Sequence, residues 1–196
     1  MQVPTDPASP LNGATKLRSA TLASEAVERA FGHRVRVRAA GLLFDRAENP
    51  ERVLLLKHDG LWDDGPFWSP PGGAIEFGEA LSEGVRREFE EEAGLSVRVG
   101  EPAYVLDFVR PPLHAVSFYF RVYPADGTYA NLEQRLRTGT DPELLADGVQ
   151  LLQEARFIPL DDLPHLRLYP EGLAERLPRD ARAGFPDGTQ YVGTLR

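Results

Sequence analysis

The sequence of 196 residues contains no cysteine, only four histidines and only two lysines. Without cysteine the chain has no disulfides and no thiolate ligands, and four scattered histidines do not predict a zinc site. No apolar run approaches the roughly 20 residues that a membrane-spanning helix needs. The first ten residues lack the basic start and apolar stretch of a signal peptide, so we expect a cytoplasmic protein without a membrane partner.

Basic residues are fewer than acidic ones. The chain has 22 basic and 30 acidic residues, for a net charge of −8. A nucleic acid, itself a polyanion, would be repelled by such a chain, so we expect no nucleic-acid partner. All basic residues except Lys16 and Lys57 are arginines. Arginine binds phosphate through paired N–H groups, but genomic base composition is the simpler explanation for this bias.

The length fits one domain with short extensions. We expect a mobile tail over residues 1–15, a short helical segment over 16–32, one domain over 33–165 and a helical or loop extension over 166–196. The domain should contain a mixed β-sheet. Strands are predicted, from alternating or continuous apolar residues, over 34–39 (extended by 41–44), 52–57, 96–99, 104–109, 115–123 and 155–159.

Helices are predicted over residues 22–31 and 79–93, with short helical pieces after Leu160. The segment 61–73 is rich in proline and glycine and is predicted to be a loop. The segment 124–149 is polar and predicts a long loop with room for a short helix.

The segment 73–95 carries seven acidic residues and two arginines. At about 100° per residue, an apolar face is formed by Leu81, Val85, Phe89 and Ala93. Glu88, Glu91 and Glu92 fall beside this face, whereas the solvated face takes Glu83, Arg86, Arg87 and Glu90. An ordinary solvated glutamate run is the alternative interpretation.

Carboxylates gathered away from water repel one another unless a cation neutralises them. Gly84 lies on the same arc of the helix and is expected to leave space for such an ion. Oxygen ligands without sulfur favour Mg²⁺ or Mn²⁺. The pattern therefore predicts a metal site on this helix.

The same stretch resembles the signature of the Nudix hydrolase family, G-x5-E-x7-R-E-U-x-E-E-x-G-U, in which U is an apolar residue. Every specified position matches, at Gly73, Glu79, Arg87, Glu88, Phe89, Glu91, Glu92, Gly94 and Leu95. The resemblance implies an α/β/α sandwich over most of residues 33–165. It also implies that Glu88, Glu91 and Glu92, with the main-chain carbonyl of Gly73, hold divalent metal.

In this resemblance one of the three glutamates is also the general base, and which one stays open. Arg87 follows Glu79 by two helical turns, so its expected role is to bridge and orient the helix. Gly94 is expected to be the helix cap.

Further substrate contacts are less specific. Arg34, Arg36 and Arg38 share one face of the first predicted strand and could meet phosphates, or could guard an exposed sheet edge. Trp68, which precedes Pro71-Gly72-Gly73 as in the family, could stack on a base, as could Trp62 and Phe67; packing is the alternative role.

Two other features come from the resemblance. Arg110 precedes Pro111-Pro112, near where relatives that act on ADP-ribose carry a proline. A later acidic ligand or base could be Glu143 or Glu154.

We therefore expect a metal-dependent hydrolase, a pyrophosphohydrolase that cleaves a nucleoside diphosphate linked to another moiety. ADP-ribose or another ADP-sugar is the first candidate. A nucleoside triphosphate pyrophosphohydrolase and a non-catalytic nucleotide-sensing module on the same fold remain alternatives. Isomerisation of an allylic diphosphate would need a cysteine, which the chain lacks. A homodimer stays open.

Overall fold

The structure is a computed structural model that describes residues 25, 28, 29, 31–59, 65–139, 151–185 and 188–195. Its strands are β1 (Val35–Leu43), β2 (Arg52–His58), β3 (Phe67–Ser69), β4 (Gly72–Ala74), β5 (Val97–Arg110), β6 (Leu113–Pro124), β7 (Leu152–Pro159) and β8 (Gln190–Leu195). Its helices are α2 (Leu81–Ala93), α3 (Leu132–Arg135), the 3₁₀ helix η2 (Leu160–His165) and α4 (Leu173–Arg182). No helix in these ranges is long and apolar enough to cross a membrane.

The strands form two sheets. One has five strands in the order β4-β1-β6-β5-β8, and the other has three in the order β3-β2-β7. In the larger sheet β1 pairs with β6 in parallel and with β4 in antiparallel orientation, so the predicted mixed sheet is confirmed.

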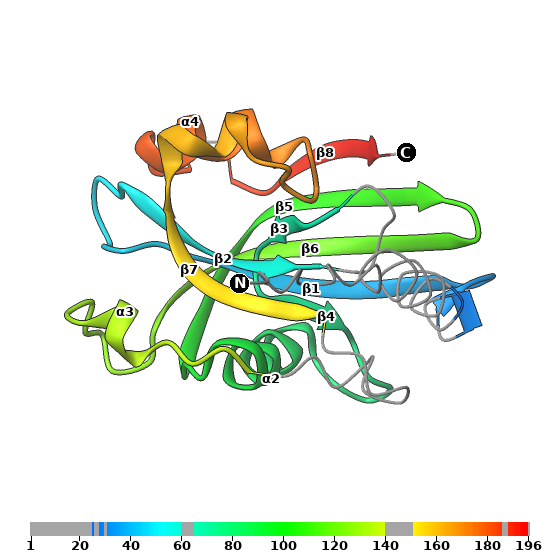
Figure 1. Cartoon of the computed structure of the whole chain (residues 1–196), viewed down its shortest axis with the longest axis horizontal. Coiled ribbons are helices and arrows are strands. Elements are labelled where there is room, and N and C mark those ends of the chain that lie inside the picture. The colour runs from blue at the N-terminus through cyan, green and yellow to red at the C-terminus, as the bar shows by residue number, and fades with distance from the viewer. Residues whose placement is uncertain are drawn as a thin grey trace, which may run out of the picture.

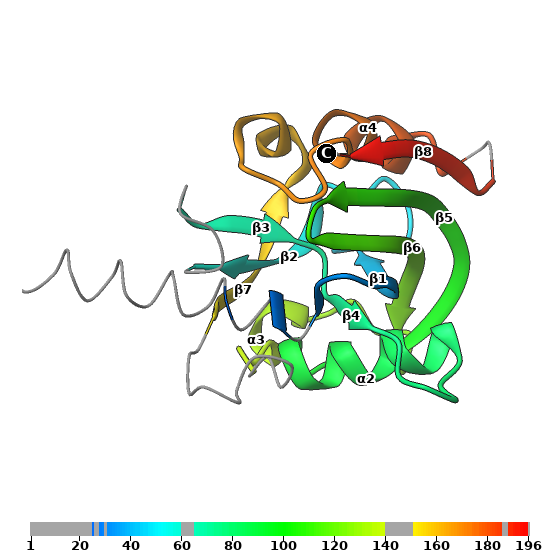
Figure 2. The same cartoon turned by 90° about the vertical axis from the view of Figure 1, so that its right-hand side faces the viewer.

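The helices cover opposite sides of the two sheets. Figures 1 and 2 show α2 on one side and α4 with η2 on the other. The expected α/β/α sandwich is therefore confirmed.

Two clusters of buried side chains hold these layers together. Val85, Phe89 and Ala93 of α2 are fully buried against Leu43 and Leu54 of the sheets. This is the apolar face that the helical spacing predicts. The second cluster lies under α4 and η2 and includes Leu173 and Leu177. Burial of one face of α2 fixes which of its glutamates can reach the interior.

Several element boundaries differ from the prediction. The predicted loop 61–73 contains β3 and β4, because the main chain on either side of the two prolines pairs with β2 and β1. The predicted strands 96–99 and 104–109 are one strand, β5, with irregular register around Pro102. Strand β8 was missed in the expected helical or loop extension over 166–196, since six residues at a sheet edge show no clear alternation.

Other predictions fall outside the described residues. The tail 1–15, most of 16–32 and the segment 140–149 of the long loop lie there. The described part of that loop contains the short helix α3.

Candidate active site

Helix α2 is fixed at both ends by local hydrogen bonds. At its start the Glu83 carboxylate accepts the N–H of Ala80 at 2.9 Å, and Glu79 accepts the N–H of Glu76 at 3.0 Å. At its end Gly94 adopts the left-handed conformation (φ 66°) and donates its N–H to the carbonyl of Glu90. A glycine meets this backbone requirement with little strain. The side chains of α2 therefore project from a well-anchored helix.

Glu88 and Glu92 are the two glutamates that α2 turns inward. Each is only 3% exposed. The Glu88 carboxylate lies against Gly73, where an added Cβ would come within 2.0 Å of Glu88 Oε1. Glu92 Oε2 accepts the N–H of Gly72 at 2.9 Å. The glycine pair thus provides both the space and one hydrogen bond that these carboxylates need.

Arg87 joins the glutamates on the flank of the helix. Its guanidinium donates to Glu79 at 2.9 Å and 3.1 Å, to Glu88 at 2.9 Å and to Glu91 at 3.1 Å. It also donates to the carbonyl of Ala74 at 3.1 Å, which ties α2 to β4. The hydrogen bonds to Glu79 raise the pKa of Arg87, and the same contact lowers the pKa of Glu79 below its usual value.

These groups could hold a hard divalent cation. The possible metal-ligating atoms on this side of α2 are carboxylate and peptide oxygens, and such oxygens suit Mg²⁺ or Mn²⁺. Within the described ranges no three Asp, Glu or His side chains are grouped to hold a metal on their own. Mg²⁺ is commonly bound by one or two carboxylates together with water and substrate phosphates, so the buried pair Glu88 and Glu92 fits this chemistry.

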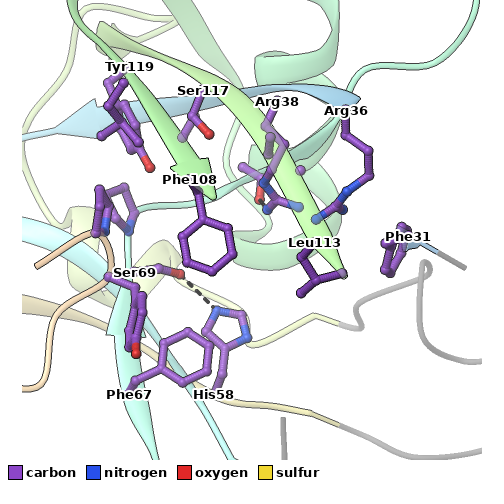
Figure 3. A pocket seen from close by; sticks show the side chains of 18 of the residues that line it. Phe31, Arg36, Arg38, His58, Phe67, Ser69, Phe108, Leu113, Ser117 and Tyr119 are labelled. Atoms are coloured by element: carbon purple, nitrogen blue, oxygen red, sulfur yellow. Dashed lines mark hydrogen bonds between the residues drawn. The ribbon is translucent and has the colours of Figure 1, made fainter. Parts of the chain in front are cut away.

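A cavity of about 190 Å³ opens beside Gly72, Gly73 and Glu92. One wall comes from β1 and β6 and carries Arg36, Arg38, Ser117 and Tyr119. The opposite wall comes from β2 and β3 and carries His58, Phe67 and Ser69; Phe108 of β5 lies between the walls (Figure 3). A ligand in this cavity would therefore touch both sheets and the inner end of α2.

The two walls differ in charge. Arg36 and Arg38 are cationic, and Arg38 Nη2 donates to the carbonyl of Gly72 at 3.0 Å. On the other wall burial, helped by the charge of Arg38, lowers the pKa of His58 to about 4, so its imidazole is neutral at pH 7. Burial also raises the pKa of Tyr119 to about 12, which keeps its phenol neutral. The cavity thus combines a cationic side with uncharged polar groups.

A model of the NUDIX domain matches residues 35–179, which include β1, α2 and most of the cavity wall. The chain belongs to the Nudix family. The resemblance found in the signature is confirmed, and with it the enzyme class expected of the chain, a Nudix pyrophosphohydrolase.

Solved structures share the Nudix fold at low sequence identity. The ORF135 protein of E. coli matches with a TM-score of 0.55 and 19% identity, over 79% of this chain and 95% of that protein. A MutT protein from Methanosarcina mazei Go1 matches with a TM-score of 0.55 and 21% identity, over 74% and 94%. A MutT NUDIX hydrolase from Burkholderia pseudomallei matches with a TM-score of 0.53 and 20% identity, over 72% and 95%.

The structure brings part of the predicted site of this Nudix chain together. Gly73 and Glu92 line the cavity, and so do the predicted substrate contacts Arg36 and Arg38. Glu91 is instead partly exposed, with 35% of its side chain accessible, and is held by Arg87.

Among the other predicted contacts Phe67 also lines the cavity, and the rest lie elsewhere. Trp68 is 8% exposed within the core, and Arg110 is exposed at the end of β5; neither lines the cavity in the described structure. Glu154 pairs with Arg156 at 3.4 Å on β7. Trp62 and Glu143 lie outside the described residues.

One interpretation of the sequence is wrong. Gly84 leaves no room for a cation, because a Cβ there would come within 2.4 Å of Ile75. Arg38 does not guard a sheet edge, since β1 is paired there with both β4 and β6; the pairing with β4 covers Arg38–Ala40 and does not include Arg34 or Arg36. The strand turns Arg36 and Arg38 towards the cavity and leaves Val35 60% and Val37 44% exposed.

The cavity residues that sequence reasoning missed include His58, Ser69, Phe108, Ser117 and Tyr119. Each is an isolated polar or aromatic residue within or beside an apolar strand, far from the signature in sequence. One signal was available. His58 and Ser69 are polar side chains in or beside strands that are predicted or found to be buried, and a buried polar side chain requires a hydrogen-bond partner.

Proposed function

We propose that the chain hydrolyses the diphosphate linkage of a nucleoside diphosphate joined to another group. The observation that supports this most directly is the buried pair Glu88 and Glu92 beside Gly72–Gly73, next to a cavity that is also lined by Arg36 and Arg38. An oxygen-rich metal site and two arginines are the groups that a diphosphate requires. The aromatic side chains in the lining, Phe67, Phe108 and Tyr169, suit the remainder of a nucleotide.

In this proposal Glu88 and Glu92, with Glu91 and the carbonyl of Gly73, hold Mg²⁺ or Mn²⁺. When bound, the metal supplies Lewis-acid activation of water and neutralises charge on the diphosphate. One of the three glutamates accepts the proton of the attacking water. Arg38 orients the diphosphate beside Gly72, and Arg36, about 7 Å further along the same strand face, binds the more distant phosphate oxygens.

Arg87 has a structural part in this scheme. Its bonds to Glu79, Glu88 and Ala74 hold the carboxylates and β4 in one arrangement. Because its guanidinium already contacts three glutamates, we assign it to positioning rather than to substrate binding.

The test is a panel of nucleotide compounds incubated with Mg²⁺ in ¹⁸O-labelled water. ADP-ribose and other ADP-sugars are tested first, because Pro111–Pro112 is the feature that favours them. Nucleoside triphosphates test the alternative pyrophosphohydrolase activity. We expect cleavage that stops in excess chelator, with ¹⁸O in a phosphate product because water attacks phosphorus. Label only in a sugar hydroxyl, or no turnover of any compound, would overturn the proposal.

A further inference from the structure

His58 is the polar residue at the centre of the uncharged cavity wall. It is 8% exposed, its ring stacks on Phe67 with centroids 5.1 Å apart and planes 17° apart, and its Nε2 lies 3.0 Å from Ser69 Oγ (Figure 3). The stack fixes the plane of the ring, and the hydrogen bond fixes its rotation. An imidazole held in this way presents its remaining nitrogen in one direction.

That remaining nitrogen is Nδ1. Among the described residues the contact with Ser69 is the one hydrogen bond to the ring. Since His58 lines the cavity and Nδ1 has no hydrogen-bond partner in the described part of the chain, this nitrogen is available to a ligand. None of the proposed catalytic steps uses His58, so the function proposed above does not account for it.

The charge pattern of the cavity indicates which part of a ligand lies beside His58. Phosphate groups belong with Arg36 and Arg38, since the chain Arg38–Gly72–Glu92 of hydrogen bonds leads directly to the candidate metal ligands. His58 is neutral and adds no cation that would attract a phosphate, so its side of the cavity suits an uncharged group. The lining by Phe67, Phe108 and Tyr169 favours a flat ring that stacks on aromatic side chains. A nucleobase is uncharged, flat and carries hydrogen-bonding atoms at its edge.

We propose that His58 is a specificity-determining residue that hydrogen-bonds the nucleobase through Nδ1, with Ser69 as its positioning residue. A neutral imidazole has one N–H, and the Ser69 hydroxyl can either accept from Nε2 or donate to it. The direction of this bond decides whether Nδ1 is the acceptor or the donor. A base with the wrong group at that point leaves Nδ1 unsatisfied and binds more weakly.

This inference rests on the proposed function for the presence of a nucleotide, but its test does not require hydrolysis. The experiment is calorimetric binding of AMP, GMP, CMP and UMP to the full chain with Mg²⁺. His58→Phe keeps the aromatic stack and removes both nitrogens, Ser69→Ala removes the partner, and Ser69→Thr restores a hydroxyl. His114→Phe, the same exchange on β6 outside the cavity lining, is the matched control.

We expect the wild-type chain and His114→Phe to bind one base at least about tenfold more tightly than the weakest. His58→Phe should weaken the binding of the preferred nucleotide by about tenfold and bring the four affinities close together. Ser69→Ala should also reduce the difference between the highest and the lowest of the four affinities, and Ser69→Thr should restore this difference. If Ser69→Ala and Ser69→Thr behave alike, Ser69 does not position the ring.

Two results would overturn the role of His58. One is a wild-type chain that binds all four nucleotides equally or binds none of them. The other is unchanged base preference in His58→Phe. If the wild-type chain binds one base at least about tenfold more tightly than the weakest but cleaves no compound of the panel, the proposed hydrolysis fails and the recognition of the base by His58 stands.

Discussion

The main-chain N–H of Gly72 donates a 2.9 Å hydrogen bond to Oε2 of Glu92, so strand β4 is tied to a buried carboxylate near the end of α2. The same glycine accepts a bond from Arg38 through its carbonyl. Gly72 thus connects the cationic wall of the cavity with the candidate metal site. Because glutamine can also accept the Gly72 N–H, Glu92→Gln is expected to affect chemistry more than folding.

Glu92→Gln should lower turnover by on the order of 100- to 1,000-fold, because it removes one charged ligand from the proposed metal site. Glu90→Gln should leave turnover nearly unchanged, since Glu90 is exposed on the opposite face of α2. Both changes remove one charge from the same acidic run. In metal-free buffer we expect unfolding free energies within about 1 kcal/mol of the wild type, because glutamine can still accept the Gly72 N–H. Equal activity losses would show that bulk charge, and not ligation, explains the helix.

Arg87→Met should destabilise the fold by about 2 kcal/mol or more, because it removes five hydrogen bonds and leaves Glu79 and Glu88 without this cation. Arg86→Met is the matched control, one residue away but exposed, and should change stability by less than about 0.5 kcal/mol. Urea unfolding in metal-free buffer measures both. Similar losses for the two variants would contradict the structural role of Arg87.

Mg²⁺ should stabilise the folded chain, since it binds the native carboxylates and not the unfolded chain. At 100 times its dissociation constant the melting temperature should rise by about 5 °C or more. Gly73→Ala should reduce this rise, because its Cβ would lie 2.0 Å from Glu88 Oε1 and displace that carboxylate.

Gly65→Ala is the control for this effect. A Cβ at Gly65 meets no atom of the described residues within 4 Å, although its φ of 95° makes alanine unfavourable there. We expect a lower melting temperature in metal-free buffer and an unchanged response to Mg²⁺. A full Mg²⁺ response in Gly73→Ala would argue against a metal site at Glu88.

The sequence predicts α2 and its two inward glutamates well because both follow from local periodicity. Val85, Phe89 and Ala93 recur at helical spacing, so the buried face and the position of Glu92 beside it can be read from one segment. Strands β3 and β4 are different. They are three residues long, and their pairing with β2 and β1 depends on distant chain segments that no local pattern reveals.

The cavity was unpredictable for the same reason. His58 and Ser69 are 11 residues apart, and they meet only because β2 and β3 pair with Leu56 opposite Ser69. The direction of the arginines in β1 was ambiguous as well, since alternation shows that two faces differ but not which face is covered. Here the long arginines line the cavity and the valines face outwards.

The stability of the folded chain should depend on pH through His58. Burial lowers the pKa of His58 to about 4 in the folded chain, against 6.5 in a solvated histidine. Between these values the unfolded chain takes up a proton that the folded chain does not, so the free energy of unfolding falls as the pH falls. The contribution is complete above pH 6.5 and declines towards pH 4. His58 alone should remove about 2 kcal/mol between pH 7 and pH 5.

His58→Phe isolates this contribution, because phenylalanine has no proton to gain and can keep the stack on Phe67. The unfolding free energy of the variant should therefore depend less steeply on pH between 7 and 5 than that of the wild type. Urea unfolding at pH 7, 6 and 5 gives both slopes, with His114→Phe to show the effect of losing a histidine outside the cavity. Parallel curves for the wild type and His58→Phe would mean that the pKa of His58 is the same in the folded and the unfolded chain, and the wall opposite Arg36 and Arg38 would then gain a positive charge as the pH falls below about 6.5.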